Sequence, residues 1–238
     1  DHKKDEKQFL RFRKDLYQRG NAFIDNSCFM IREVFRRHTS FLDGKEIWPL
    51  NVIHEGRIVS QGIVVYAKDL PEYIQLCFLE SLPDQPEAVQ LLADRAAEIG
   101  RQKGCRKLVA GLNGHVNYGL GFLCSHYDAA NSFSGAANPP YYHTYLKAMD
   151  FTEVRMHTYV LHSIDNRLEK YRRVIDRLDR TYTYRTFDKK RFREDAKIYT
   201  DLNNKAFSGH RYYYRRTYRE DLEMLKELFL FMKEDSRI

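Results

Sequence analysis

The apolar positions recur with a helical period at the start of the chain and with a strand period after it. Between residues 5 and 18 they lie at i, i+3, i+7 and i+8, on one face of a helix, which predicts an amphipathic helix that stops near Gly20. These positions are Phe9, Phe12, Leu16 and Tyr17. A second, short helix is expected over about 28–37. From Glu46 the alternation is that of strands, and two turn signals divide it into an antiparallel meander with strands at 47–54, 57–67 and 73–82.

A longer helix is predicted directly after the meander. Asp84 and Glu87 are three apart and are typical of a capping box at its start, and Lys103-Gly104 marks its end. Its inward stripe is Ala88, Val89, Leu92, Ala96 and Ile99. The apolar run at 107–112 then predicts a fourth strand.

The second half of the chain alternates between helix and strand signals. Asn138 followed by Pro139 predicts a helix start, because Asn accepts from the first free N–H groups and proline fits the first helical position. Asp188, and Thr217 with Glu220, predict the caps of two later helices. The predicted series is a helix at 139–149, a strand at 151–162, a charged helix at about 165–179 and a strand at 181–187. Two helices follow. The first has the inward stripe Phe192, Ala196, Tyr199, Leu202 and Ala206, and the second has Leu222, Leu225, Leu228, Phe229 and Met232 inward.

Composition narrows the class of protein without naming a function. The four cysteines are scattered with no Cys-x-x-Cys pair, which indicates free thiols, a reducing, cytoplasmic compartment and no metal site. No apolar run reaches the length of a membrane span. The formal charge of +7 is mixed with acids throughout, which favours solvated helix faces over a nucleic-acid site. Because the chain begins at Asp1 and stops directly after a helical pattern, we expect a piece of a longer protein.

The segment after the fourth strand is the first candidate for a binding site. Three glycines, Gly114, Gly119 and Gly121, occur where a backbone takes positive φ or approaches another group closely. Side chains with donors and acceptors accompany them, namely Asn113, His115, Asn117 and Tyr118. These side chains either bind a polar ligand or satisfy the backbone of a sharp bend.

The order of elements and three motifs resemble the GNAT (acyl-CoA N-acyltransferase) superfamily. The motifs are Phe78-Leu-Glu80-Ser81, the Gly-rich run 111–122, and Asn138-Pro-Pro-Tyr-Tyr142. They are similar to those of a little-characterised bacterial tandem-GNAT-like group, over about residues 5–162. The resemblance implies an α/β fold with a mixed, mostly antiparallel twisted sheet flanked by helices, in which a helix crosses from the third strand to a near-parallel fourth.

The resemblance also implies a reaction, the transfer of an acyl group from acetyl-CoA or another acyl-CoA to the amine of a small molecule or peptide. Glu80 matches the position of the general base, and Tyr142 and Tyr145 lie where the family keeps a tyrosine that protonates the departing thiolate. Tyr141 shares their helix face. It is expected to bind substrate together with Asn138 and the polar residues of the glycine-rich loop. The plainer interpretation is that Glu80 is a surface or ion-paired residue and that the tyrosines pack on the sheet.

One part of the family pattern is missing. GNAT proteins bind the pyrophosphate of acyl-CoA with successive backbone N–H groups where the crossover helix starts, usually through an Arg/Gln-x-x-Gly-x-Gly/Ala signature. The matching segment, 81–87, has no glycine, two prolines without N–H groups and two acids that repel a pyrophosphate. The resemblance to the fold therefore does not imply CoA binding by this unit.

The order of elements also divides the chain. Residues 1–163 are expected to form one GNAT-like unit, and residues 164–238 a linker helix and the βαα opening of a second, incomplete unit, completed by a missing half or a partner subunit. One alternative is a non-catalytic GNAT-like module that binds a polar ligand or supports a partner unit. A second, less favoured, is a nucleic-acid-binding protein that uses the Tyr- and Arg-rich segment 211–219.

Overall fold

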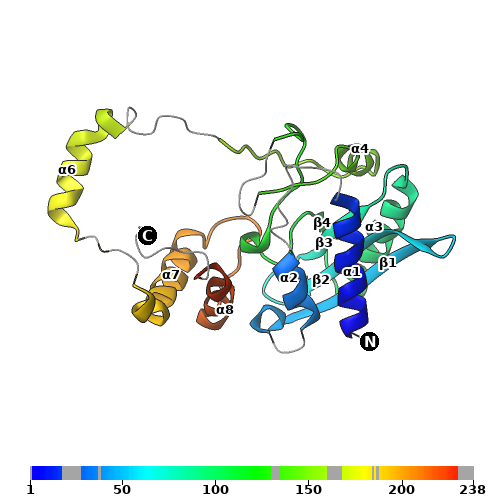
Figure 1. The fold of residues 1–238 in the computed structure, drawn as a ribbon, viewed down its shortest axis with the longest axis horizontal. Coiled ribbons are helices and arrows are strands. Elements are labelled where there is room, and N and C mark those ends of the chain that lie inside the picture. The colour runs from blue at the N-terminus through cyan, green and yellow to red at the C-terminus, as the bar shows by residue number, and fades with distance from the viewer. Residues whose placement is uncertain are drawn as a thin grey trace.

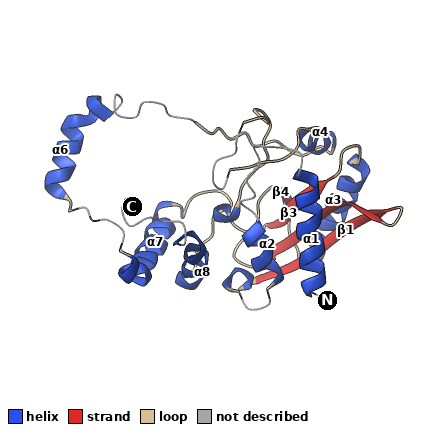
Figure 2. Ribbon diagram, in the orientation of Figure 1, coloured by secondary structure: helices blue, strands red, loops and turns tan. Residues whose placement is uncertain are grey.

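The structure of the protein is a computed structural model. It describes residues 2–17, 28–36, 39–129, 135–159, 168–183, 185 and 188–229. These residues form an α/β structure in which helices flank a four-stranded mixed sheet, as Figures 1 and 2 show. The expected α/β class is therefore confirmed.

The sheet has the strand order β1-β2-β3-β4 and contains the predicted meander. β1 (Lys45–His54), β2 (Arg57–Ala67) and β3 (Tyr73–Ser81) pair antiparallel in sequence. The turn between β1 and β2 places Glu55 and Gly56 at positive φ, 47° and 75°, as a tight two-residue hairpin requires. β4 (Lys107–Ala110) pairs parallel to β3, as expected for a strand that follows a crossover helix.

Helices cover both faces of this sheet (Figure 2). α3 (Pro86–Gln102) lies on one face, and the whole predicted stripe from Ala88 to Ile99 is buried there against Val64, Ile74 and Leu76. α1 (His2–Tyr17) and α2 (Cys28–Phe35) cover the other face, where they pack on Ile63, Val65 and Cys77. The two helices predicted near the start of the chain are confirmed, while Gly20 lies outside the described residues.

Strands β3 and β4 separate after a short parallel ladder. Their pairing runs from Tyr73 with Lys107 to Leu76 with Ala110, but β3 continues to Ser81. A bulge interrupts β3 beside β2, and Phe78 takes a φ of 49° there. Within the described part of the chain, the end of β3 therefore has no strand beside it on the β4 side.

Two predicted helix starts are wrong in detail. Asp84 and Glu87 form no capping box, because Asp84 adopts a φ of 58° outside the helix and α3 begins at Pro86 without a side-chain cap. Likewise α4 begins at Tyr141 rather than at Pro139, and it ends at Ala148. The Asn138 side chain bonds the backbone of Leu123 in the preceding loop and not the helix N-terminus.

The strands predicted after α4 are not found in the described residues. Residues 151–159 form no strand, and 152–159 are exposed. Residues 181–183 and 185 also form none, because Thr181 ends α6 (Arg172–Thr181). Residues 160–162, 184 and 186–187 lie outside the described part of the chain. An alternating pattern makes a strand only where another strand offers a ladder, and neither segment has one.

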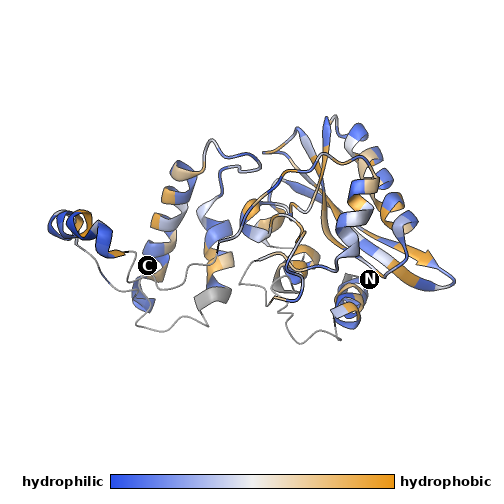
Figure 3. Ribbon diagram, turned by 90° about the horizontal axis from the view of Figure 1, so that it is seen from above, coloured by the Kyte–Doolittle hydropathy of each residue, from blue (hydrophilic) through white to orange (hydrophobic). Residues whose placement is uncertain are grey.

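The helices of the C-terminal region differ in how they pack (Figures 1 and 3). α6, with the turn η3 (Glu169–Tyr171) before it, stands apart from every other helix in both views. α7 (Phe192–Ala206) and α8 (Tyr218–Phe229) pack together, and α8 also packs against the turn of residues 40–42 that precedes β1. Among the described helices, none combines the length and the apolar character that crossing a membrane requires.

The predicted caps of α7 and α8 are present. Asp188 caps the turn η4 (Lys189–Arg191), which leads directly into α7. The capping box of α8 is confirmed, because Glu220 accepts the N–H of Thr217 at 2.9 Å and donates its own N–H to the Thr217 hydroxyl at 3.2 Å. The predicted stripe of α7 is partly wrong, since its buried face is Ala196, Thr200 and Asn204, whereas Leu202 is 60% exposed. The side chains of Leu228, Phe229 and Met232 lie outside the described part.

Candidate functional site

Glu80 lies at the end of β3, where the sheet opens, and is almost completely buried. Its exposed fraction is 2%. The hydroxyls of Tyr17 from α1 and Tyr142 from α4 both donate to Oε2, each at 2.8 Å. Nη1 of Arg13, a buried residue of α1, forms an ion pair with Oε1. We call these four residues the Glu80 cluster.

The Glu80 cluster leaves little room for acid–base chemistry in this arrangement. A general base must reach the proton that it removes. Here the carboxylate receives three donors from its own chain, and the buried guanidinium of Arg13 balances its charge. Burial, with Tyr17 as the next cause, raises the pKa of Tyr142 well above 10, which makes its hydroxyl a poorer proton donor than an ordinary tyrosine.

The tyrosines of α4 lie on one helix face, as predicted, and all three hydroxyls bond the chain near the start of α3. Tyr142 accepts the N–H of Ser81 at 2.6 Å, and Tyr141 donates to the Ser81 carbonyl at 2.7 Å. Tyr145 accepts the N–H of Gln85 at 3.3 Å. The two bonds to Ser81 satisfy backbone groups at the end of β3, where the described residues provide no neighbouring strand on the β4 side. The tyrosines therefore replace the missing part of the ladder.

The segment 81–86, which leads into α3, offers few free N–H donors to the pyrophosphate of an acyl-CoA. The N–H groups of Ser81 and Gln85 are bonded to tyrosine hydroxyls, and that of Leu82 donates to the Val59 carbonyl at 2.9 Å. Pro83 and Pro86 have no N–H. In the segment 81–86 only Asp84 remains, and its carboxylate repels an anion. A row of free N–H donors, which an anion site at a helix start needs, is not present in this segment.

The glycine-rich loop after β4 folds back onto the sheet. Asn113 accepts the N–H of Phe78 through Oδ1 at 2.9 Å, so it holds the bulge of β3, and the N–H of Gly114 donates to buried Gln75. Gly114 has a φ of 84°, and a Cβ there would lie 2.7 Å from the Phe41 ring. Close approach between backbone and side chain explains this glycine.

His115 lies in this loop and is fully buried against the C-terminal segment. Its Nδ1 accepts the N–H of Asn117 at 3.1 Å, so the neutral ring carries its proton on Nε2, which lies 3.1 Å from the Tyr214 carbonyl. The rings of Tyr213 and Tyr214 meet the imidazole edge-on. Burial, followed by the charge of Arg216, lowers the pKa of His115 to about 3. His115 is thus a neutral structural histidine.

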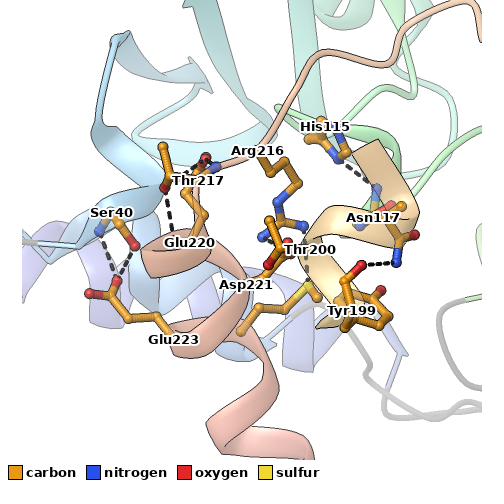
Figure 4. A network of polar contacts seen from close by, with 12 residues as sticks. Ser40, His115, Asn117, Tyr199, Thr200, Arg216, Thr217, Glu220, Asp221 and Glu223 are labelled. Carbon is orange, nitrogen blue, oxygen red and sulfur yellow. Dashed lines mark hydrogen bonds and ion pairs between the residues drawn. The ribbon is translucent and has the colours of Figure 1, made fainter. Parts of the chain in front are cut away.

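A network of buried charges joins the same loop to α8, and Figure 4 shows part of it. Arg216 donates to the Tyr118 hydroxyl at 2.7 Å, with its guanidinium over the Tyr118 ring, and lies 3.2 Å from Asp221. Nζ of Lys45 in β1 lies 3.4 Å from Oε1 of Glu220. Both members of both ion pairs have side chains at most 5% exposed. Burial lowers the pKa of Lys45 and raises that of Asp221.

Contacts at the edge of this network complete an interface that we call the junction. Glu223 of α8 accepts from both the N–H and the hydroxyl of Ser40, which lies in the turn η1 (Ser40–Leu42) before β1 (Figure 4). A cavity of about 20 Å³ beside it, between Phe41 and Met224, has room for about one water molecule. The junction therefore consists of the loop 111–121, η1 and the start of β1 on one side, and residues 213–224 on the other.

The comparisons with known proteins add no relative. No family model, curated protein or solved structure matches the chain. The relation to the GNAT superfamily therefore remains an inference from motifs and element order.

The structure places the predicted site residues in four different surroundings. Glu80, Tyr141, Tyr142 and Tyr145 come together at the end of β3, while Asn138 joins the loop at Leu123. The loop residues divide between the sheet and the junction, and these are Asn113, His115, Asn117 and Tyr118. Among the described residues, no three His, Cys, Asp or Glu side chains could hold a metal ion together.

The segment 211–219 is mostly part of the junction. Tyr213 and Tyr214 are 7% exposed and Arg216 is 4% exposed. Bases stack on exposed aromatic rings, and these two rings are covered. Arg211, Arg215 and Arg219 remain exposed at the surface. The exposed arginines alone do not favour the nucleic-acid alternative.

Proposed function

We propose that the sheet unit, residues 45–148, is a non-catalytic GNAT-like module that recognises and holds the C-terminal helical unit α7–α8. The junction carries this proposal. It brings Lys45, His115 and Tyr118 of the sheet unit against Glu220, the Tyr214 carbonyl and Arg216, all of them buried. In this proposal α7 and α8 open a second unit, whose other half or a partner subunit completes the assembly.

The buried ion pairs of the junction contribute more to the selection of the matching segment than to the free energy of folding. Burying an ion pair costs desolvation that apolar residues of the same volume avoid, so such pairs contribute little net stability. They penalise a wrong neighbour strongly, however, because an unpaired buried charge is expensive. The sheet unit therefore accepts only a segment that presents the matching charges.

The state of the expected catalytic groups supports the non-catalytic interpretation. Glu80 is bonded by Arg13, Tyr17 and Tyr142, and in the segment 81–86 every backbone N–H donor except that of Asp84 is already bonded or absent. The free thiols of Cys77, Cys105 and Cys124 support the expected reducing, cytoplasmic compartment.

Hydrogen exchange on the Arg216→Met variant tests the proposal. Methionine leaves Asp221 as an unpaired buried charge, which costs about 3–5 kcal/mol. The amides of α7 and α8 should then exchange at least about tenfold faster, while those of β2 and β3 keep their wild-type rates. The matched control is Arg215→Met, which changes the exposed neighbour of the same segment. Equal acceleration throughout the chain, or none in α7 and α8, would show that the junction is not a separable interface.

A second candidate function is the expected N-acyl transfer from an acyl-CoA to an amine. One observation favours it. The sheet opens beside Glu80, and Tyr142 lies 2.8 Å from its carboxylate, the pair of groups that a GNAT-type base and acid require. This function needs an acyl donor that binds without the amides at the start of α3.

Calorimetric titration with acetyl-CoA and a longer acyl-CoA separates the two candidates. The non-catalytic module should give no heat of binding up to millimolar ligand. Micromolar binding, together with acyl transfer that Glu80→Gln and Tyr142→Phe slow, would establish the enzyme instead. Tyr159→Phe, at a site 87% exposed, is the control for the tyrosine change.

A further inference from the structure

The helix α6 carries an apolar stripe that nothing in the described structure covers. Its exposed members, counted with the flanking residues, are Leu168 at 44%, Tyr171 at 50%, Val174 at 55%, Leu178 at 40% and Tyr182 at 60%. With half-buried Ile175 they recur every three or four residues, so they form one face. The opposite face is polar and includes Lys170, Arg173, Arg177 and Arg180. α6 is therefore strongly amphipathic.

An isolated helix of this length needs a partner. Helices shorter than about 12–15 residues are marginal in water, and within proteins their stability comes from packing of the apolar face. α6 spans Arg172–Thr181 and stands apart from the other helices in two perpendicular views (Figures 1 and 3). Among the described residues, every member of the stripe except half-buried Ile175 is at least 40% exposed, so its apolar face is accessible to another molecule.

The charges beside the stripe favour a second α6 as that partner. Arg172 and Asp179 are seven residues apart and flank the stripe on the same side. In an antiparallel pair with Ile175 beside Leu178 of the other helix, each Arg172 faces the Asp179 of its partner, which gives two ion pairs by symmetry. A parallel pair would place Asp179 beside Val174 of the other helix, so that Asp179 would have no opposite charge there.

We propose that α6 pairs antiparallel with α6 of a second copy of this chain. Two helices of this length bury less than the roughly 800 Å² per partner of a standard stable interface. The association is therefore weak and concentration-dependent, with a dissociation constant on the order of 100 μM. It differs from the junction, which acts within one chain.

Sedimentation equilibrium of the full 238-residue chain from about 5 to 500 μM tests this pairing. The wild type should form dimers in the upper half of this range. Leu178→Asp places a charge in the stripe and should weaken association more than tenfold. Arg173→Asp introduces the same aspartate on the opposite face and should leave association as it is.

A charge exchange tests the antiparallel geometry itself. Arg172→Asp alone, or Asp179→Arg alone, sets like charges against each other and should weaken self-association roughly tenfold. An equimolar mixture of these two variants should associate about as well as the wild type, because each charge then meets its opposite, and so should the double variant. Arg172 also bonds Glu169 within its own helix at 3.0 Å. The Arg172→Asp chain lacks the bond to Glu169 both alone and in the mixture. Any recovery of association in the mixture therefore comes from the contact between the two helices.

Three outcomes would overturn the pairing. The first is a wild type that stays monomeric up to 500 μM, and the second is self-association that Leu178→Asp does not change. The third is a mixture of the two charge variants that associates no better than either alone. If the protein is monomeric and binds anionic lipid vesicles through the same face, the partner of α6 is a membrane surface and the proposal is wrong.

Discussion

Mild acid should weaken the junction, because His115 cannot accept a proton without breaking it. Nδ1 of the ring accepts the N–H of Asn117. A proton on Nδ1 would therefore point at the Asn117 N–H, and this hydrogen bond would be lost. Burial and the charge of Arg216 add to this cost and hold the pKa of His115 at about 3, against about 6.5 for an ordinary histidine.

The size of the effect follows from the two pKa values. Below about pH 6.5 the unfolded chain binds a proton at His115, whereas in the folded chain this ring stays neutral until the pH approaches 3. The free energy of unfolding therefore falls as the pH falls. Each pH unit costs about 1.4 kcal/mol until the pH approaches the folded pKa. Between pH 7 and pH 5, before most carboxylates titrate, His115 alone should cost about 2 kcal/mol.

Urea denaturation at pH 7, 6 and 5, followed by circular dichroism, measures this loss. His115→Gln keeps an N–H donor for the Tyr214 carbonyl but cannot be protonated, so its free energy of unfolding should fall about 2 kcal/mol less than that of the wild type. The comparison uses the pH dependence and not the absolute stability, so any packing loss in the variant cancels. His210→Gln, at an exposed position, should behave like the wild type.

An equal loss of stability in the wild type and in His115→Gln over this range would show that His115 is not kept unprotonated by the junction. Nuclear magnetic resonance gives a second test. The His115 ring signals should stay unchanged between pH 8 and pH 5, and a titration near pH 6.5 would mean that the ring is not held in the junction.

Three further predictions concern single contacts, all measured as free energies of unfolding in urea. Arg13→Met should cost about 3–5 kcal/mol, because it leaves Glu80 unpaired, and adding Glu80→Gln should recover part of that loss; strictly additive losses would contradict the buried pair. Thr217→Ala removes the hydroxyl cap of α8 and should cost about 1 kcal/mol, whereas no loss would mean that the cap is not formed. Gly114→Ala should cost clearly more than Gly104→Ala, since both have positive φ but only the first meets a side chain, and equal costs would rule out crowding at Phe41.

The part of the fold that the sequence predicts best is the part with local signals. Residues 45–110 carry strand alternation, tight turns and a helical stripe, and the strands and α3 appear there nearly as expected. Residues 151–159 show apolar residues at strand-like spacing, but a strand also needs a neighbour, and that neighbour depends on the tertiary fold. The start of α4 shifted for a related reason, because Asn138 is bonded to a loop fifteen residues away in sequence.

The sequence predicted the tyrosine face of α4 in the candidate site but not the residues that surround Glu80. The spacing of Tyr141 and Tyr145 placed them on one face with Tyr142, which a helix dictates by itself. The partner of Glu80 depends on which helix covers the sheet, and the sequence does not specify this. One signal was present, however. Arg13 lies four residues after Phe9 and four before Tyr17, and a charge on the inward stripe of an amphipathic helix requires a buried counterion.

The buried charges of the junction and of the Glu80 cluster have a common explanation. Apolar residues of the same volume would hold α8 on the sheet unit about as well, but they would also accept other apolar faces, such as Ile198 and Leu202 on the exposed side of α7. Lys45 and His115 accept only a segment with the right charge and carbonyl at the right spacing. At the end of β3, a ligand that used the Ser81 amide would first have to displace the Tyr142 hydroxyl, which leaves a buried group unpaired at about 1–3 kcal/mol. Polar groups paired in this way select one internal arrangement, and an acyl donor at the end of β3 would have to displace the Tyr142 hydroxyl before any chemistry began.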